Sequence, residues 1–146
     1  MQIFKNPDEH VVKRLLSDAE LPTADLTPAH MDHFFGCGAR DAVEGVVGLE
    51  LFGRTALLRS LAVAVPARGC GLGKQLVAEA ESYAREQGVE ALFLLTTTAE
   101  RFFDRLGYRR IAREAVPDSI KATPEYAGIC PASSAVMCKR LSAGAG

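Results

Sequence analysis

The chain has 146 residues, 48% of them hydrophobic and 24% charged, with a formal net charge of -1 at neutral pH. This length and composition are typical of one globular domain and argue against a disordered chain. The near-zero net charge provides no electrostatic basis for binding nucleic acid or an anionic membrane surface. No apolar run approaches the ~20 residues of a membrane span, and the N-terminus lacks a signal peptide's basic and apolar regions, so we expect a cytoplasmic protein.

The first half of the sequence predicts one helix followed by strands. Residues 7–21 carry apolar side chains at helical spacing after an acidic opening, and Pro22 is expected to end this amphipathic helix. Residues 33–39 are a candidate for a short strand. Residues 42–65 indicate two strands joined at Gly53-Arg54, where a glycine in the first position suits a type II′ hairpin turn.

The second half predicts alternating helices and strands. A surface helix follows from residue 72 and ends at Gly88, and residues 89–97 form a continuous apolar run typical of a buried strand. Thr97 and Glu100 have the spacing of a capping box, which begins a short helix that ends before Gly107. Residues 108–116 predict a further strand, and residues 133–141 predict the last one. The stretch between them, residues 117–131, is interrupted by prolines and predicts an irregular connection.

These elements predict a mixed α/β domain built on one central sheet. We expect a single domain over residues 1–141 and a disordered tail over residues 142–146. Cys37, Cys70, Cys130 and Cys138 include no C-x-x-C pair, so they are expected to be ordinary thiols, with a soft-metalloid site formed only on folding as the alternative.

The glycine-rich stretch from Ala67 to Leu76 (ARGCGLGKQL) lies between a predicted strand and a predicted helix. Backbone N–H groups in such a turn converge on an anion, with the helix dipole behind them. A P-loop would need a glycine where Arg68 stands and a hydroxyl residue where Gln75 stands. A dinucleotide fingerprint would need its third glycine at Lys74, so the spacing excludes both motifs.

The spacing that fits is R-x-x-G-x-G over residues 68–73, which resembles the pyrophosphate-binding motif of the GNAT superfamily of acyl-CoA-dependent N-acetyltransferases. LRSLAV precedes the motif as the family's fourth strand does, and AERFFDRLGY follows at the distance, and with the ending, of a second family segment. Residues 48–63, 94–110 and 130–141 also resemble acetyltransferases of arsenic-resistance operons and the acetyltransferase domain of N-acetylglutamate synthase. The resemblance implies a GNAT fold of the α/β (α+β) class, whose mixed, mostly antiparallel sheet of six to seven strands is flanked by about four helices.

The resemblance also implies how the cosubstrate acetyl-CoA is held. Its pantetheine would lie along the fourth strand like an added strand, and its pyrophosphate would bind the backbone N–H groups of the glycine loop. Arg68 would support the loop or reach a phosphate oxygen. The implied cofactor-binding residues are Leu61, Ala62, Val63, Arg68, Gly69, Cys70, Gly71, Leu72, Gly73, Lys74, Phe102 and Arg105, and no metal ligand is expected.

The predicted hairpin provides candidate catalytic residues. If the strands pair across Gly53-Arg54, Glu50 and Arg59 share one face as diagonal neighbours. Some family members carry a general-base glutamate where this chain has Leu57, and Glu50 would point into the same space. We therefore expect Glu50 to be the base and Arg59 to hold a substrate carboxylate, with a purely structural ion pair as the alternative. Ser60 is a weaker catalytic candidate, expected on the opposite face.

The sequence departs from the family at Phe103, where a tyrosine often acts as general acid. A CoA thiolate is a tolerable leaving group at neutral pH, because its thiol pKa should lie near the ~8.5 of cysteine. Tyr108 and Tyr126 are substitutes, although packing roles are the simpler expectation for both. Among the histidines, His10, His30 and His33 are expected in surface or loop positions, with acceptor-site lining by one of the last two as the alternative.

The predicted function is transfer of an acetyl group to the amine of a small, amino-acid-like acceptor by direct attack, with a link to arsenic resistance through the narrower resemblance. The expected partner is this small-molecule amine, with no nucleic acid or membrane, and a homodimer is expected by family analogy. The alternatives are a catalytically idle acyl-CoA sensor and a metalloid-binding accessory protein.

Overall fold

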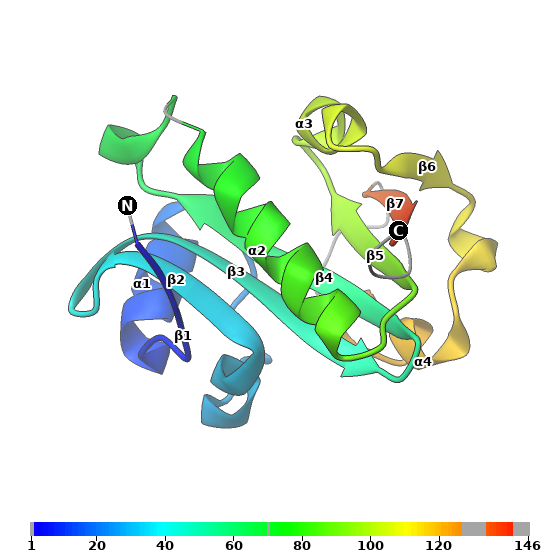
Figure 1. Cartoon of the computed structure of the whole chain (residues 1–146), viewed down its shortest axis with the longest axis horizontal. Helices are drawn as coiled ribbons and strands as arrows, with labels where there is room; N and C mark the ends of the chain where they lie inside the picture. The colour runs from blue at the N-terminus through cyan, green and yellow to red at the C-terminus, as the bar shows by residue number, and fades with distance from the viewer. Residues whose placement is uncertain (1, 70, 127–133, 142–146) are drawn as a thin grey trace. The chain divides into compact units, whose positions relative to one another are not determined.

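The computed structural model describes residues 2–69, 71–126 and 134–141 (Figure 1). The chain divides into two compact units, the first formed by residues 1–50 and 58–82 and the second by residues 51–57 and 83–146. The single domain predicted over residues 1–141 stays a prediction. The predicted tail, Cys70 and Cys130 lie outside the described residues.

Seven strands form a sheet in the order β1-β2-β3-β4-β5-β7-β6. The pairing is antiparallel for β1 with β2, β2 with β3, β5 with β7 and β6 with β7, whereas β4 and β5 run parallel. This confirms the predicted mixed, mostly antiparallel sheet. The strands are β1 (Ile3–Lys5), β2 (Phe34–Ala39), β3 (Ala42–Phe52), β4 (Thr55–Val63), β5 (Ala91–Thr96), β6 (Arg109–Ile111) and β7 (Ala135–Arg140).

Four α-helices and three 3-10 helices connect the strands within the described residues. The α-helices are α1 (Glu9–Asp18), α2 (Leu72–Glu86), α3 (Glu100–Arg105) and α4 (Asp118–Lys121). The 3-10 helices are η1 (Pro28–His33), η2 (Val65–Ala67) and η3 (Arg113–Ala115). No helix in the described part of the chain is both long and apolar enough to span a membrane.

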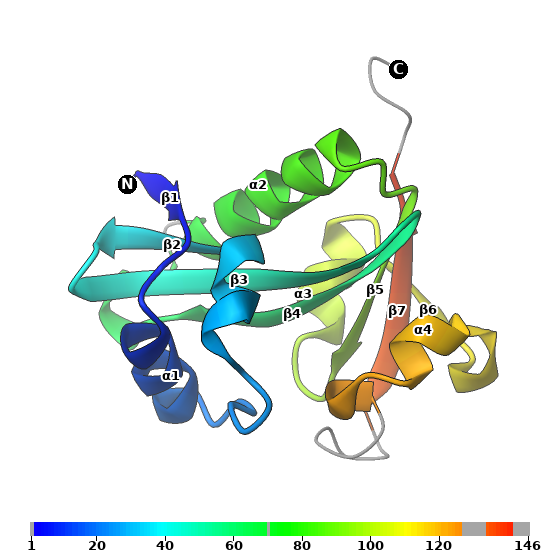
Figure 2. The same cartoon turned by 90° about the horizontal axis from the view of Figure 1, so that it is seen from below.

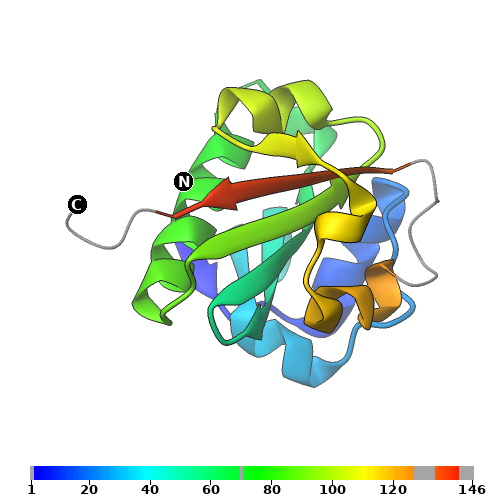
Figure 3. The ribbon, with the colours of Figure 1, turned by 90° about the vertical axis from the view of Figure 1, so that its right-hand side faces the viewer.

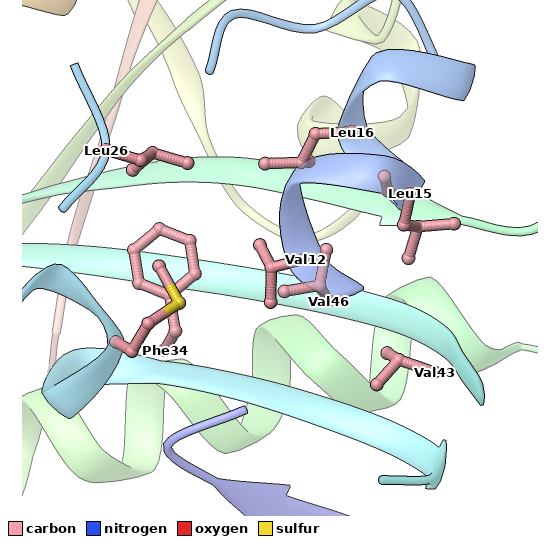
Figure 4. Packing of buried hydrophobic residues seen from close by; sticks show 9 residues of the cluster. Val12, Leu15, Leu16, Leu26, Phe34, Val43 and Val46 are labelled. Carbon is pink, nitrogen blue, oxygen red and sulfur yellow. The ribbon is translucent and has the colours of Figure 1, made fainter. Parts of the chain in front are cut away.

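In the first unit, α1 and the start of α2 cover opposite faces of the strands (Figure 2). The apolar face of α1, which carries Val12, Leu15 and Leu16, packs on side chains of β2 and β3 (Figure 4). On the other face, a Cβ added at Gly45 would stand 2.9 Å from the Leu76 side chain, so α2 packs closely on the backbone of β3. This two-sided burial explains why residues 45–49 of β3 are buried in an unbroken run without a charged side chain.

In the second unit, β7 lies between β5 and β6 (Figure 3). Its hydrophobic core combines residues from the strands, from α4 and from the segment that follows η3: Leu57, Phe93, Val116, Ile120 and Val136. β5 pairs with β4 at Thr55–Leu57. Phe93 faces this core, and Leu92 and Leu94, which alternate with it along β5, are also buried. The continuous apolar sequence of β5 therefore reflects burial on both faces of the strand.

Two helix boundaries differ from the sequence prediction. Pro22 does not end α1, because the helix already stops at Asp18 with Glu20 in a left-handed conformation (φ 59°). The Leu21 N–H bonds to Leu16 O and the Glu20 N–H bonds to Ser17 O, which is the Schellman pattern. The local backbone bonds, rather than the later proline, terminate this helix.

The predicted capping box of α3 is also wrong. Ala99 is the N-cap residue of α3, and its own N–H donates to Thr96 Oγ1 at 2.9 Å. Thr97 therefore lies before the cap and cannot act as the cap residue. The predicted C-terminal stop is correct, because Gly107 has φ 97° and the Tyr108 N–H bonds to Phe103 O.

The predicted hairpin is confirmed. β3 ends at Phe52 and β4 begins at Thr55, with Gly53 at φ 70° and Arg54 outside the positive-φ region. This combination matches a type II′ turn, in which only the first central residue needs a positive φ.

Candidate active site

The glycine loop joins β4 to α2 within the first unit. Gly69 and Gly71 have φ of 90° and 77°, and a Cβ built on either residue would meet nothing within 4 Å. These glycines therefore supply a left-handed backbone beside open space, as a loop that admits a close ligand requires. The first helical bond after the loop runs from the Gln75 N–H to Gly71 O.

The start of α2 offers unpaired backbone donors. By helix geometry, the N–H groups of Leu72, Gly73 and Lys74 have no intrahelical acceptor. Gly71 has no side chain to accept them, and the first turn carries no acidic residue. At the start of α1, by contrast, the Asp8 carboxylate accepts the N–H groups of His10 and Val11. The N-terminus of α2 is thus the one of the two that suits an external anion.

Arg68 braces this loop. Its Nε donates to Val63 O at 2.9 Å, which ties the exposed loop back to the end of β4. The sequence prediction left two roles open for Arg68, and this bond corresponds to the supporting role. The register pairs β4 with β5 only at Thr55–Leu57, so Leu58–Val63 keep one backbone edge outside that pairing among the described residues.

Glu50 and Arg59 meet as the hairpin parity predicts. Arg59 Nη1 donates to Glu50 Oε2 at 2.8 Å. Arg59 also grips Asp25, with Nη1 2.5 Å from Oδ2 and Nη2 2.9 Å from Oδ1. The Arg59 side chain is fully buried, whereas the Glu50 side chain keeps 14% of its surface exposed. Asp25 and Arg59 form the inner end of this cluster, and Glu50 lies toward solvent.

Ser60 does not lie on the opposite face as predicted. Its hydroxyl oxygen accepts a hydrogen bond from Arg59 Nε at 3.1 Å. The reason is a backbone conformation with φ 60°, which breaks the alternation of side chains along β4. The alternation of side chains along a strand therefore does not predict the position of Ser60, whose hydroxyl lies beside Arg59.

His30 reaches the same cluster from η1. Its Nδ1 lies 3.1 Å from the Thr27 backbone nitrogen and 2.9 Å from Thr27 Oγ1, in a capping box. Its Nε2 lies 3.8 Å from Glu50 Oε1. We name the Asp25, His30, Glu50, Arg59 and Ser60 side chains the Arg59 cluster.

The electrostatics of the cluster centre on Arg59. Burial alone would raise the pKa of Asp25, but the hydrogen bonds and positive charge of Arg59 outweigh it and hold that pKa below its ordinary value. Two carboxylates surround one guanidinium, so the ionised pair and Arg59 carry a net charge of -1 when His30 is neutral. The cluster as a whole therefore favours a cationic guest over an anionic one.

Asp25, His30 and Glu50 each place one ligand atom within 4.8 Å of the others, the spacing of a small metal site. Arg59 already bonds to both carboxylates, and a bound cation would have to stand beside its positive charge. This arrangement favours an ion-pair network over a metal centre.

The other predicted site residues belong to the second unit. Phe102 and Arg105 lie on α3, with Phe102 partly buried and Arg105 exposed. Phe103 is buried beside Tyr108, whose ring centroid is 5.4 Å away and which is itself fully buried. The roles of Phe102 and Arg105 stay predictions.

Tyr126, the other candidate tyrosine, and the described cysteines Cys37 and Cys138 are partly or fully buried. The Tyr126 hydroxyl donates to Arg113 O at 3.1 Å. Cys37 is fully buried, and burial raises its thiol pKa to about 11. Burial also raises the pKa of the Cys138 thiol. These settings favour packing for Tyr126 and ordinary thiols for Cys37 and Cys138.

Sequence reasoning missed Asp25, and it gave a position beside the acceptor site for His30 or His33 only as an alternative. Asp25 is 34 residues from Arg59 and sits in a loop without any motif spacing. The T-x-x-H spacing of Thr27 and His30 resembles a capping box with histidine in place of glutamate or glutamine, and it was the available signal for η1.

Comparison with known proteins places the chain among acetyltransferases. The sequence model of the Acetyltransferase (GNAT) family matches residues 4–108. An uncharacterized N-acetyltransferase of Chlorobaculum tepidum is 36% identical over 92 residues, which cover 62% of this chain and 59% of that protein. A Bacillus subtilis protein named as an acetyltransferase is 34% identical over 77 residues, which cover 52% of each chain. The chain thus spans about half the length of these curated relatives.

Solved structures share the fold. The N-acetylglutamate synthase of Neisseria gonorrhoeae, crystallised with coenzyme A and L-arginine, matches with a TM-score of 0.80 at 20% identity and covers 97% of this chain and 33% of that one. A Mycobacterium tuberculosis protein crystallised with CoA matches with a TM-score of 0.75 at 18% identity, covering 97% and 99%. The family match over residues 4–108 and the agreement in fold together show that this chain belongs to the GNAT acetyltransferase family.

Proposed function

We propose that this protein is an acetyl-CoA-dependent N-acetyltransferase that acts on the amine of a small molecule. The observation that carries the proposal is the start of α2, where two left-handed glycines open a loop beside unpaired N–H groups. This arrangement fits a pyrophosphate, because the anion would complete the hydrogen bonding of the first helical turn. The family match supports acetyl-CoA as the source of that pyrophosphate.

On the donor side, the residues that would hold acetyl-CoA are those of the loop and of β4. The N–H groups of residues 69–74 would bind the pyrophosphate, and Arg68 would keep the loop attached to Val63. The open backbone edge of Leu61–Val63 would hydrogen-bond the pantetheine as an added strand does. When bound, acetyl-CoA supplies the acetyl thioester that an amine can attack.

On the acceptor side, Glu50 is the proposed base. Its carboxylate is partly exposed, and Arg59 fixes Oε2, so Oε1 is the oxygen that can take a proton from the acceptor ammonium. Arg59 itself is fully buried and donates to Asp25, Glu50 and Ser60. This geometry favours a positioning role for Arg59 over the predicted role of holding a substrate carboxylate.

The acceptor class remains part of the proposal. A Neisseria gonorrhoeae N-acetylglutamate synthase was crystallised with coenzyme A and N-acetyl-glutamate, which supports an amino-acid-like acceptor as the first class to test. Amine-bearing organoarsenicals form the second class, because arsenite offers no amine to acetylate. A cytoplasmic location, a homodimer and the absence of nucleic-acid or membrane partners stay predictions.

The first experiment measures CoA-thiol release across a panel of amino acids, glutamate analogues and amino-organoarsenicals. With the best acceptor, Glu50→Gln should lower kcat by roughly 100-fold to 10,000-fold, the range of general-base catalysis, while CoA affinity is unchanged. Glutamine keeps the size of the side chain and an oxygen for Arg59. Glu79→Gln, on the exposed face of α2, is the matched control and should leave kcat unchanged.

Two results would count against parts of this proposal. Full turnover by Glu50→Gln would remove Glu50 as the base and leave the family membership intact. Tight CoA binding without thiol release from any amine would favour the idle sensor, the second candidate. That candidate is supported by the buried phenyl ring of Phe103, which leaves no phenol where the family often has one.

The donor site is tested by comparing Gly71→Ala with Gly88→Ala. Both glycines have positive φ (77° and 87°) and open space around an added Cβ, so the backbone cost of alanine should be similar, about 1 kcal/mol. Only Gly71 lies at the proposed pyrophosphate site. Calorimetry should show CoA affinity falling at least about tenfold for Gly71→Ala and remaining unchanged for Gly88→Ala. Equal affinity in the two variants would contradict the loop assignment.

A further inference from the structure

We infer that His30 is a positioning residue for Glu50, and that it presents an N–H group to the base because a helix cap fixes its ring. The inference rests on the proposed role of Glu50. It adds a residue that neither the hairpin parity nor the family motif identifies.

The cap determines which nitrogen of His30 carries a proton. A backbone N–H can only donate, so the Thr27 N–H, 3.1 Å from Nδ1, requires a lone pair on that nitrogen in the neutral ring. The hydrogen of the neutral ring is therefore on Nε2. If the ring is charged, Nδ1 donates to Thr27 Oγ1 at 2.9 Å and Nε2 again carries a hydrogen. As long as Nδ1 keeps its contact with Thr27, Nε2 is therefore a donor in both the neutral and the charged ring.

That donor faces the carboxylate oxygen that Arg59 does not hold. Nε2 lies 3.8 Å from Glu50 Oε1, while Arg59 Nη1 lies 2.8 Å from Oε2. A separation of 3.8 Å exceeds a direct hydrogen bond and is short enough for one water to bridge the two atoms, accepting from Nε2–H and donating to Oε1. The two oxygens of Glu50 thus face donors from different segments, η1 and β4.

Among the charged and imidazole side chains of the Arg59 cluster, the most exposed are those of this pair. The His30 and Glu50 side chains are 23% and 14% exposed, against 6% for Asp25 and none for Arg59. Because Nε2 already bears a hydrogen, His30 cannot be the base. Its role is to fix the Glu50 carboxylate so that Oε1 faces the acceptor amine.

The test compares two replacements of nearly equal shape, His30→Gln and His30→Glu. Both keep an oxygen for the Thr27 N–H, as glutamine and glutamate do in ordinary capping boxes, but only glutamine retains an N–H donor. His30→Glu should lower kcat at least about tenfold with the KM for acetyl-CoA unchanged, and His30→Gln should retain most of kcat. His10→Glu, the same charge change on the exposed side of α1, should leave kcat unchanged.

The outcomes separate this inference from the proposed function. Wild-type kcat in His30→Glu, or an equal loss in both variants, would overturn the donor role of His30. Hydrogen exchange at the Thr27 amide should show that both variants keep the cap. The ring nitrogen shifts of wild-type His30 should report the Nε2–H form, and an Nδ1–H form would overturn the inference without any activity measurement. An inactive wild type would instead be a failure of the proposed function.

Discussion

Arg59 is the residue on which the order of the candidate site depends. A fully buried guanidinium loses its hydration, and only close carboxylates with good geometry offset that cost. Asp25 supplies a two-point contact and Glu50 a single one, so Glu50 is left with an oxygen for chemistry. Replacing Arg59 would leave two carboxylates without their shared partner, which is why Glu50→Gln is the cleaner test of the base.

Asp25 should make stability depend on acidic pH. Its folded pKa is lowered, so its contribution is fully present above the unfolded value near 3.8 and is lost as pH falls through the folded value. At pH 7, Asp25→Asn should reduce the free energy of unfolding by up to about 3–5 kcal/mol, the cost of breaking a buried ion pair. The difference from wild type should shrink as the pH falls below about 4, where carboxyl groups begin to take up protons.

Urea denaturation at a series of pH values measures this difference. Asp41→Asn, an exposed carboxyl in the turn between β2 and β3, is the control and should follow the wild-type curve. A wild-type advantage that stays constant from pH 7 into the acid range would contradict the role given to the ionised Asp25.

At the scale of elements, the buried strand β3 contains a glycine, Gly48, beside which a neighbouring ring leaves no space for a side chain. Gly48 lies directly opposite Phe34 in the register of β2 and β3, and a Cβ on Gly48 would stand 2.2 Å from the Phe34 ring. Phe34 is itself fully buried, so its ring has little space to move. The glycine is therefore required by its neighbour rather than by its own backbone conformation.

Gly48→Ala should destabilise the protein by about 1–3 kcal/mol, the usual cost of overpacking a core. Phe34→Leu in the same chain should recover part of this loss, because the smaller side chain leaves space for the new methyl group. Chemical denaturation of the two single variants and the double variant measures the coupling. If the losses of the two single variants simply add in the double variant, contact with the Phe34 ring is not the cause of the destabilisation by Gly48→Ala.

Elements with strong local signals could be predicted, whereas β1 and α4 could not. The spacing of apolar residues indicated α1 and α2, and the Gly53-Arg54 turn indicated the hairpin of β3 and β4. The three residues of β1 carry too little pattern, and their strand conformation comes from pairing with β2. α4 has four residues within a stretch that prolines interrupt, so the sequence indicated only an irregular connection there.

At the scale of the whole molecule, the proposed donor site and the proposed acceptor site both lie in the first unit. The glycine loop and the Arg59 cluster both belong to it, although they are separated along the sequence. Motif spacing predicted the loop and strand parity predicted the contact between Glu50 and Arg59. The position of Asp25 could not be predicted, because it depends on a loop folding back across 34 residues to meet Arg59.

The left-handed backbone at Ser60 has a consequence for how this chain balances stability against order. A residue with a side chain loses about 1–2 kcal/mol in this conformation, and glycine would remove that loss. Glycine would also remove the hydroxyl that accepts from Arg59 Nε. The loss of this acceptor costs about 1–3 kcal/mol for a buried charged donor, which offsets the backbone gain. Ser60→Gly should therefore change the free energy of unfolding little while it loosens the guanidinium that holds Glu50.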